Sequence, residues 1–102
     1  MRKCICTGVL VALSLALAPI VALTQPSTFE PRVDRPGSDY RNFTPRNPDP
    51  GDCREACLAE QQCRAWTFVR PDIQGPNAVC WLKDSVPEAQ GNDCCTSGVI
   101  RR

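Results

Sequence analysis

The chain has 102 residues, of which 12 are basic, 11 are acidic and none is histidine. This balanced charge offers no broad positive surface to a phosphate backbone, so nucleic acid is not an expected partner. The lack of histidine removes the usual general base and the commonest metal ligand, which excludes histidine-based hydrolase triads and most zinc-hydrolase sites.

The N-terminal segment has the layout of a secretory signal peptide. Met1-Arg2-Lys3 is positively charged, and residues 8–23 are almost entirely apolar but too short for a confident membrane span. We expect residues 1–22 to be removed, with cleavage after Ala22, give or take about two residues. The alternative is an uncleaved N-terminal anchor. With cleavage, the rest of the chain is secreted or periplasmic and has no stable membrane insertion.

The segment after the signal is expected to be a flexible leader, residues 23–36. It contains three prolines, scattered charges and few large apolar side chains, so it buries too little surface to order itself. A turn at Gly37-Ser38-Asp39 then leads into a short strand from about Tyr40 to Phe43.

A helix follows, and its start is well marked. Asp49 is a suitable N-cap, Pro50 fits the first helical position, and Asp52 lies in the first turn near the positive end of the helix dipole. The helix is expected to reach about residue 61. Cys53 and Cys57 are then one turn apart on the same face, from which both can reach a sheet beneath the helix.

Two strands follow the helix. Residues 65–69, rich in β-branched and aromatic side chains, predict the first, and the exposed loop 71–77 separates it from the second at 78–83. Alternation places Cys80 toward the helix. We expect Trp81 on the opposite face, together with Trp66 and Phe68, which alternate with their neighbours in the first strand.

The last expected elements are a turn at residues 91–93 and a short strand at 97–101. No internal repeat or low-complexity tract is visible in the chain.

The cysteines predict a disulfide framework. Cys4 and Cys6 lie in the positive region and leave with the signal, which gives an even set in a compact part of about 68 residues, near the lower limit for a core without staples. In an oxidising compartment such a set forms disulfides. The six are Cys53, Cys57, Cys63, Cys80, Cys94 and Cys95.

The adjacent pair, Cys94 and Cys95, has two possible arrangements. The two residues either bridge each other or pair with two separate partners, and the residues alone leave both open. In a structural interpretation both are static staples. In a functional one they form a more reducible bond or a link to another chain.

Neither a metal nor another cofactor is expected. Structural zinc sites usually show paired Cys-x-x-Cys knuckles, whereas Cys53 and Cys57 are separated by one helical turn and Cys63 stands alone. A Cys-x-x-Cys redox motif is also missing.

Catalysis is not expected either. The remaining carboxylates, such as Asp52 with Glu55 on the helix and Asp72 and Asp84 beside the strands, fit solvated charges better than a paired acid and base.

Ligand contacts are expected at the exposed strand ends, in the 71–77 loop and at the tryptophans, because binding residues of small modules gather on loops. Aromatic side chains in strands are more often core residues, and the polar ones can equally form a solvated rim. The candidates are Arg64, Trp66, Arg70, Asp72, Gln74 and Trp81.

Five motifs in register resemble a PAN/apple domain of the bacterial type. They are Gly37-x-Asp39-Tyr40-x-x-Phe43, Cys53-x-x-Ala56-Cys57, Cys63-x-Ala65-Trp66-Thr67-Phe68-Val69, Cys80-Trp81-Leu82-Lys83 and Cys94-Cys95-x-Ser97-Gly98-Val99. The resemblance covers about residues 33–100, and residues 37–102 are assigned to this domain. The cysteine that joins the termini in the apple subtype has no counterpart here.

The resemblance implies an α+β fold in which a curved antiparallel β-sheet cradles one α-helix. It implies by analogy that Cys53 joins Cys80 and that Cys57 joins Cys63, and under that pairing Cys94 and Cys95 remain for each other. It further implies a non-catalytic recognition module that binds a protein or a carbohydrate outside the cytoplasm. The alternative is a structural or inhibitory protein, for example one that blocks a protease through the 71–77 loop.

Overall fold

The computed structural model describes Gly8 and residues 26–102. The predicted signal peptide, with Cys4 and Cys6, lies outside the described residues apart from Gly8. In the described part of the chain, no helix combines the length and the apolar character needed to cross a membrane.

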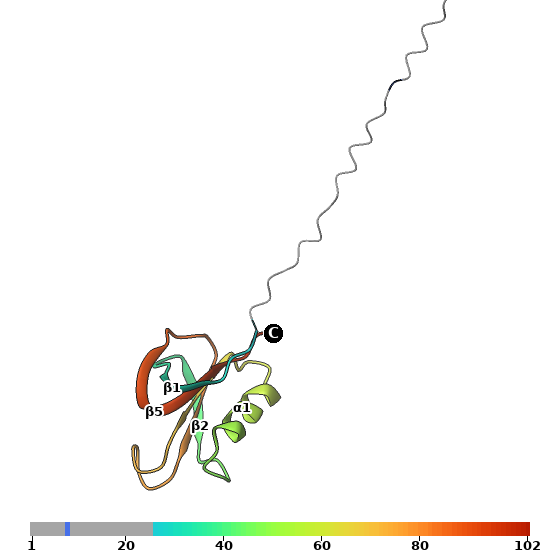
Figure 1. Ribbon diagram of the computed structural model, residues 1–102. Helices are drawn as coiled ribbons and strands as arrows, with labels where there is room; N and C mark the ends of the chain where they lie inside the picture. Colours follow the sequence, from blue (N-terminus) through green and yellow to red (C-terminus); the bar gives the residue numbers. More distant parts are fainter. Residues whose placement is uncertain (1–7, 9–25) are drawn as a thin grey trace, which may run out of the picture.

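The fold is a five-stranded antiparallel sheet with one helix packed against it, in the strand order β1-β5-β3-β4-β2 (Figure 1). This confirms the α+β fold class. In chain order the elements are β1 (Glu30–Asp34), β2 (Asp39–Phe43), α1 (Pro50–Ala59), β3 (Ala65–Val69), β4 (Val79–Lys83) and β5 (Gln90–Val99).

The start of α1 agrees with its sequence signals. The Asp49 side chain caps the helix by accepting a hydrogen bond of 2.8 Å from the backbone N–H of Gly51, and Pro50 opens it. The two buried residues of the helix are Cys53 and Cys57, as their shared face predicts.

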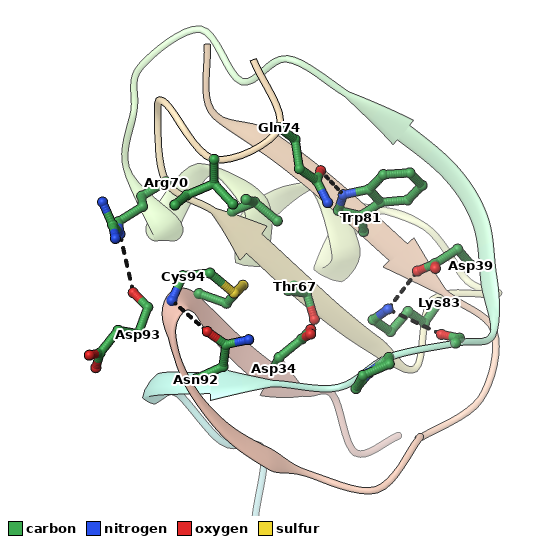
Figure 2. A pocket seen from close by; sticks show the side chains of 15 residues that line it. Asp34, Asp39, Thr67, Arg70, Gln74, Trp81, Lys83, Asn92, Asp93 and Cys94 are labelled. Carbon is green, nitrogen blue, oxygen red and sulfur yellow. Dashed lines mark hydrogen bonds and ion pairs between the residues drawn. A yellow bond between two sulfur atoms is a disulfide. The ribbon is translucent and has the colours of Figure 1, made fainter. Parts of the chain in front are cut away.

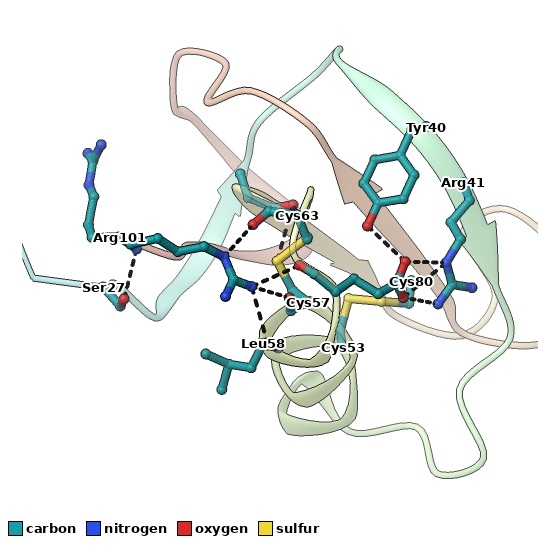
Figure 3. The surroundings of a disulfide bond; sticks show 12 residues. Ser27, Tyr40, Arg41, Cys53, Cys57, Leu58, Cys63, Cys80 and Arg101 are labelled. Atoms are coloured by element: carbon teal, nitrogen blue, oxygen red, sulfur yellow. Dashed lines mark hydrogen bonds and ion pairs between the residues drawn. A yellow bond between two sulfur atoms is a disulfide. The ribbon is translucent and has the colours of Figure 1, made fainter.

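Two disulfides fasten this helix face (Figure 3). Cys53 is bonded to Cys80 on β4, and Cys57 to Cys63 just before β3. Both pairs are as the resemblance implies, and all four cysteines have no exposed surface.

The last turn of α1 is closed by side chains from elsewhere in the chain. The guanidinium of Arg102 donates to the carbonyl oxygens of Cys57, Leu58 and Glu60 at 2.8–3.2 Å. A cation at this position satisfies carbonyls that lack partners within the helix and complements the negative end of its dipole. The Glu60 carboxylate in turn accepts hydrogen bonds from Tyr40 and Arg41 of β2, which fixes the helix end to the edge of the sheet.

The core lies between α1 and the sheet, and it corrects the expected placement of two aromatic residues. Trp66 pairs with Leu82 across β3 and β4, and Phe68 pairs with Cys80. Paired residues share a face, so Trp66 and Phe68 point toward the helix with Cys80, and only Trp81 lies on the other side.

The prediction of a flexible leader is wrong for residues 30–34, which form β1. This strand pairs with β5 through Glu30↔Ser97, Pro31↔Thr96, Val33↔Gly91 and Asp34↔Gln90, with a register shift between Pro31 and Val33. A proline is tolerated here because β1 is an edge strand. Pairing with a distant segment outweighs the weak strand propensity of these residues.

Strand β5 is also longer than expected. It runs over ten residues from Gln90 to Val99 instead of starting near 97, and the predicted turn at 91–93 lies within it. The same pairing with β1 draws these turn-type residues into the sheet. Figure 1 shows β5 curving strongly along its length.

Gly98 makes room for Trp66, the largest fully buried side chain among the described residues. Trp66 has no exposed surface, and Phe29 covers it with ring centroids 5.4 Å apart. A Cβ atom at Gly98 would lie 2.5 Å from the Trp66 ring and 2.6 Å from the carbonyl oxygen of Thr28. Neither the packed ring nor the backbone can yield easily.

We expect Gly98→Ala to lower the free energy of unfolding by roughly 2 kcal/mol, because overpacking of a tight core forces its neighbours apart. Chemical denaturation measures the change. Gly91→Ala is the matched control in the same strand, since nothing lies within 4 Å of a Cβ at that position. Equal losses in the two variants would contradict the packing argument.

The two helix disulfides should differ in their effect on stability. Cys53–Cys80 spans 27 residues and Cys57–Cys63 spans 6. In the chain-entropy model the longer loop contributes about 1 kcal/mol more. We therefore expect the double variant C53A/C80A to lose that much more stability than C57A/C63A in chemical denaturation. The opposite order would show that local strain or packing outweighs loop closure.

Candidate functional site

The sheet face opposite α1 carries a pocket of about 600 Å³. Its floor consists of the strand residues that alternate with the core residues, among them Thr67 and Val69 of β3 and Trp81 and Lys83 of β4. Asp34 of β1 and Asp39 of β2 approach from the two edge strands, and the loop between β3 and β4 overhangs one side (Figure 2). Every strand therefore supplies part of the wall.

An ion pair between a buried lysine and a partly exposed aspartate forms one end of the pocket. The Lys83 side chain is 2% exposed, and its ammonium lies 2.5 Å from an Asp39 carboxylate oxygen and 3.1 Å from the carbonyl oxygen of Gly37. A buried lysine requires such partners because desolvation of an unpaired charge is costly. The pair therefore joins β4 to β2, and its charges largely cancel.

Trp81 and Gln74 form the side beneath the overhanging loop. The indole N–H of Trp81 donates to the Gln74 side-chain oxygen at 2.9 Å, which fixes the ring and the loop relative to each other (Figure 2). Ile73, in the same loop, is 44% exposed and also lines the pocket. An aromatic and an aliphatic surface are thus available to a ligand.

The opposite side is built around Cys94 and Cys95, which are bonded to each other. The first of the two arrangements that the sequence left open is therefore the one adopted. Arg70 binds this side twice, with its backbone N–H to the Cys94 carbonyl at 3.0 Å and its Nε to the Asp93 carbonyl at 3.2 Å. Asn92 accepts a hydrogen bond from the Cys94 N–H.

Asp34 lies next to this disulfide. One of its carboxylate oxygens and the sulfur atoms of Cys94 and Cys95 all lie within 4.8 Å of one another. Three such groups have the composition of a metal site, but sulfur atoms in a disulfide are not thiolates. With the bridge formed, the Asp34 carboxylate is the one metal-ligating group of the three.

The six predicted ligand contacts are divided by the structure. Arg70, Gln74 and Trp81 line the pocket together. Trp66 has no exposed surface and belongs to the core. Arg64 and Asp72 are exposed but do not line the pocket, and Asp72 lies in a tight turn where its N–H donates to the Gly75 carbonyl.

The sequence did not predict four charged residues of the pocket: Asp34, Asp39, Lys83 and Asp93. Lys83 ends β4 directly after the buried Leu82, and this was a usable signal because a lysine beside the core needs a partner. Asp34 carried no such signal, since it lay in the expected leader.

Strand β1, and with it Asp34, is held in place by an ion pair. Arg35 donates to both carboxylate oxygens of Glu30 at 2.8 Å and to the Pro87 carbonyl at 2.6 Å. The hydrogen bond from Arg35 lowers the pKa of Glu30, although partial burial acts in the opposite direction. Bidentate arginine–carboxylate pairs are geometrically specific, so this one positions the strand end.

Comparison with known proteins identifies the domain. A PAN domain sequence family matches residues 33–83, half of the chain, in the region that runs from β1 to β4. The chain belongs to the PAN domain family. PAN domains are non-catalytic modules that generally bind proteins or carbohydrates.

One curated relative of this PAN domain is an uncharacterized protein of Acanthamoeba polyphaga mimivirus. It is 35% identical over 82 residues, which cover 79% of this chain and 22% of the relative. The match thus spans about a fifth of that protein's length. No solved structure matches the chain.

The Glu30–Arg35 pair predicts a specific pH dependence. Because its pKa is lower in the folded chain than in the unfolded chain, Glu30 stabilises the fold fully above the ordinary glutamate pKa and loses this effect as pH falls through the folded-state pKa. Between about pH 5 and about pH 3, the wild type should therefore lose more stability than Glu30→Gln. Denaturation at several pH values measures both slopes, and Arg35→Met should resemble Glu30→Gln. Equal slopes in the wild type and Glu30→Gln would contradict the assignment.

Proposed function

We propose that this PAN domain is a recognition module that binds a protein or carbohydrate ligand outside the cytoplasm, in the pocket opposite α1. The observation that carries the proposal is the grouping of Trp81, Gln74 and Arg70 around one hollow of about 600 Å³. Concave sites that combine apolar and aromatic walls with a few placed polar groups are the usual form of ligand sites.

The disulfides support the extracytoplasmic setting. Three bridges in about 80 residues persist in an oxidising compartment and are rare in a reducing one. Reduction would also remove the links from α1 to β4 and to the segment just before β3, on which the small core depends.

The rigidity of the pocket supports recognition in a preformed site. Gln74 holds the overhanging loop to Trp81, and Lys83 with Asp39 holds β4 to β2. Side chains that are already fixed lose little conformational entropy when a ligand binds, which favours affinity.

A second candidate is inhibition through the loop between β3 and β4. Residues 72–77 are exposed, Ile73 projects an apolar side chain, and the bond from Gln74 to Trp81 anchors the loop. A protruding and anchored loop of this kind suits insertion into a protease cleft. This role would use Ile73 more than the pocket floor.

Binding assays with matched variants test the proposal. A glycan array and affinity capture from extracellular extracts provide ligands, and interferometry then measures each one against the variants. We expect Trp81→Ala to weaken binding at least about tenfold, since aromatic residues that a ligand covers dominate such sites. Leu58→Ala, on the helix and 41% exposed, should leave affinity unchanged.

Three outcomes would oppose the proposal. Binding that survives Trp81→Ala unchanged would place the site elsewhere. Binding that depends on Ile73 and inhibits a protease would favour the loop role. Turnover of a bound substrate would contradict a non-catalytic module.

A further inference from the structure

The pocket contains a carboxylate without a partner. Asp34 lines the pocket, and among the described residues no ion pair or hydrogen bond involves its side chain. Figure 2 shows this side chain among those that face the hollow. A partly buried carboxylate with no partner favours a cationic ligand, because a cation restores the interactions lost on leaving water.

The other charges of the pocket do not satisfy Asp34. The Lys83 ammonium is held by Asp39 and the Gly37 carbonyl. Arg70 is exposed and its Nε donates to the Asp93 carbonyl. Both cations of the pocket are therefore directed elsewhere.

The formal charge of the lining comes from Asp34 itself, because Asp39 and Asp93 are balanced by Arg70 and Lys83. Three aspartates, Asp34, Asp39 and Asp93, stand against Arg70 and Lys83, which leaves a net charge of −1. An anionic ligand group next to Asp34 would meet like charge in a partly desolvated hollow.

The pocket that contains Asp34 also has apolar surface, which suits a long aliphatic stem. Val69, Ile73, Trp81 and the disulfide of Cys94 with Cys95 line the same pocket. A lysine or arginine side chain has an apolar stem and a charged end, and a tryptophan in the wall attracts a cation to its ring. A sugar hydroxyl group can also donate a hydrogen bond to a carboxylate, but it carries no positive charge to neutralise Asp34.

From these observations we propose that the pocket binds the basic side chain of a protein ligand, a lysine or an arginine, with Asp34 as its counter-ion. This inference rests on the proposed function and names the class of ligand for the same site. The partner is accordingly a protein that presents an exposed basic residue.

A titration with small probes tests the charge requirement on the wild-type chain with its disulfides intact. The probes are N-acetyl-lysine methylamide, its Nε-acetylated form, and N-acetyl-norleucine methylamide, which has a similar stem and no amine. NMR follows the indole N–H of Trp81 and the backbone amides of β1. We expect the lysine probe to bind with a dissociation constant on the order of millimolar, as befits a single side chain, and both uncharged probes to bind about tenfold more weakly.

Two variants test whether Asp34 is the carboxylate that binds the amine of the lysine probe. Asp34→Asn should weaken the lysine probe about tenfold, through loss of a charge-assisted hydrogen bond. Glu55→Gln is the matched control. It removes a carboxylate from the exposed face of α1, which packs on the sheet face opposite the pocket, and it should leave binding unchanged. An arginine probe tests the second basic side chain in the same way.

Each contrary result is decisive. Equal binding of the amine and its acetylated form, no binding of the lysine probe, or undiminished binding by Asp34→Asn would overturn the inference. The first two of these results come from the wild-type chain, so they remain valid even if a variant folds poorly. If a neutral sugar binds in a manner that depends on Trp81 while the amines do not, the proposed function holds and the basic ligand is excluded.

Discussion

The bond between Cys53 and Cys80 is the contact on which most of this structure depends. It joins the N-terminal half of α1 to β4 across a core too small to hold a helix firmly by hydrophobic burial alone. With the helix fixed, α1 covers one face of β3 and β4, and Trp66 and Phe68 pack beneath it. The other face is then free to carry polar side chains without loss of the core.

The alternation of β3 and β4 separates stability from recognition. Phe68 and Cys80 face the helix, while Thr67 and Trp81 face the pocket, and the two pairs are neighbours in the same register. A change at Trp81 therefore removes no side chain from the cluster between the sheet and α1, although Val69 and Lys83 of the pocket floor are themselves buried. This arrangement lets the recognition face vary while the stapled face keeps the fold.

Local signals predicted the elements whose structure is decided locally. The N-cap at Asp49 and the branched, aromatic run at residues 65–69 specify their own conformation, and both elements begin where the sequence indicated. The cysteine pairing followed from the family resemblance.

Non-local pairing explains what the sequence did not predict. Strand β1 exists because β5 offers it a partner more than fifty residues away, and neither segment has strong strand propensity. Because β1 was not predicted, the position of Asp34 in the pocket, which depends on β1, was not predicted either. The face of β3 on which Trp66 lies was predicted wrongly for a related reason. Alternation within one strand does not show which residues of the neighbouring strand lie on the same face, because that depends on the register between the strands.

The bridge between Cys94 and Cys95 differs in kind from the other two. It links adjacent residues, so it closes no length of chain and ties no two elements together, and its effect on the entropy of the unfolded chain is small. What it fixes is the local path of β5 where that strand passes the pocket and Arg70. It is a rigid part of the pocket rim and shapes the entrance that a partner meets. The other two disulfides hold the helix in place.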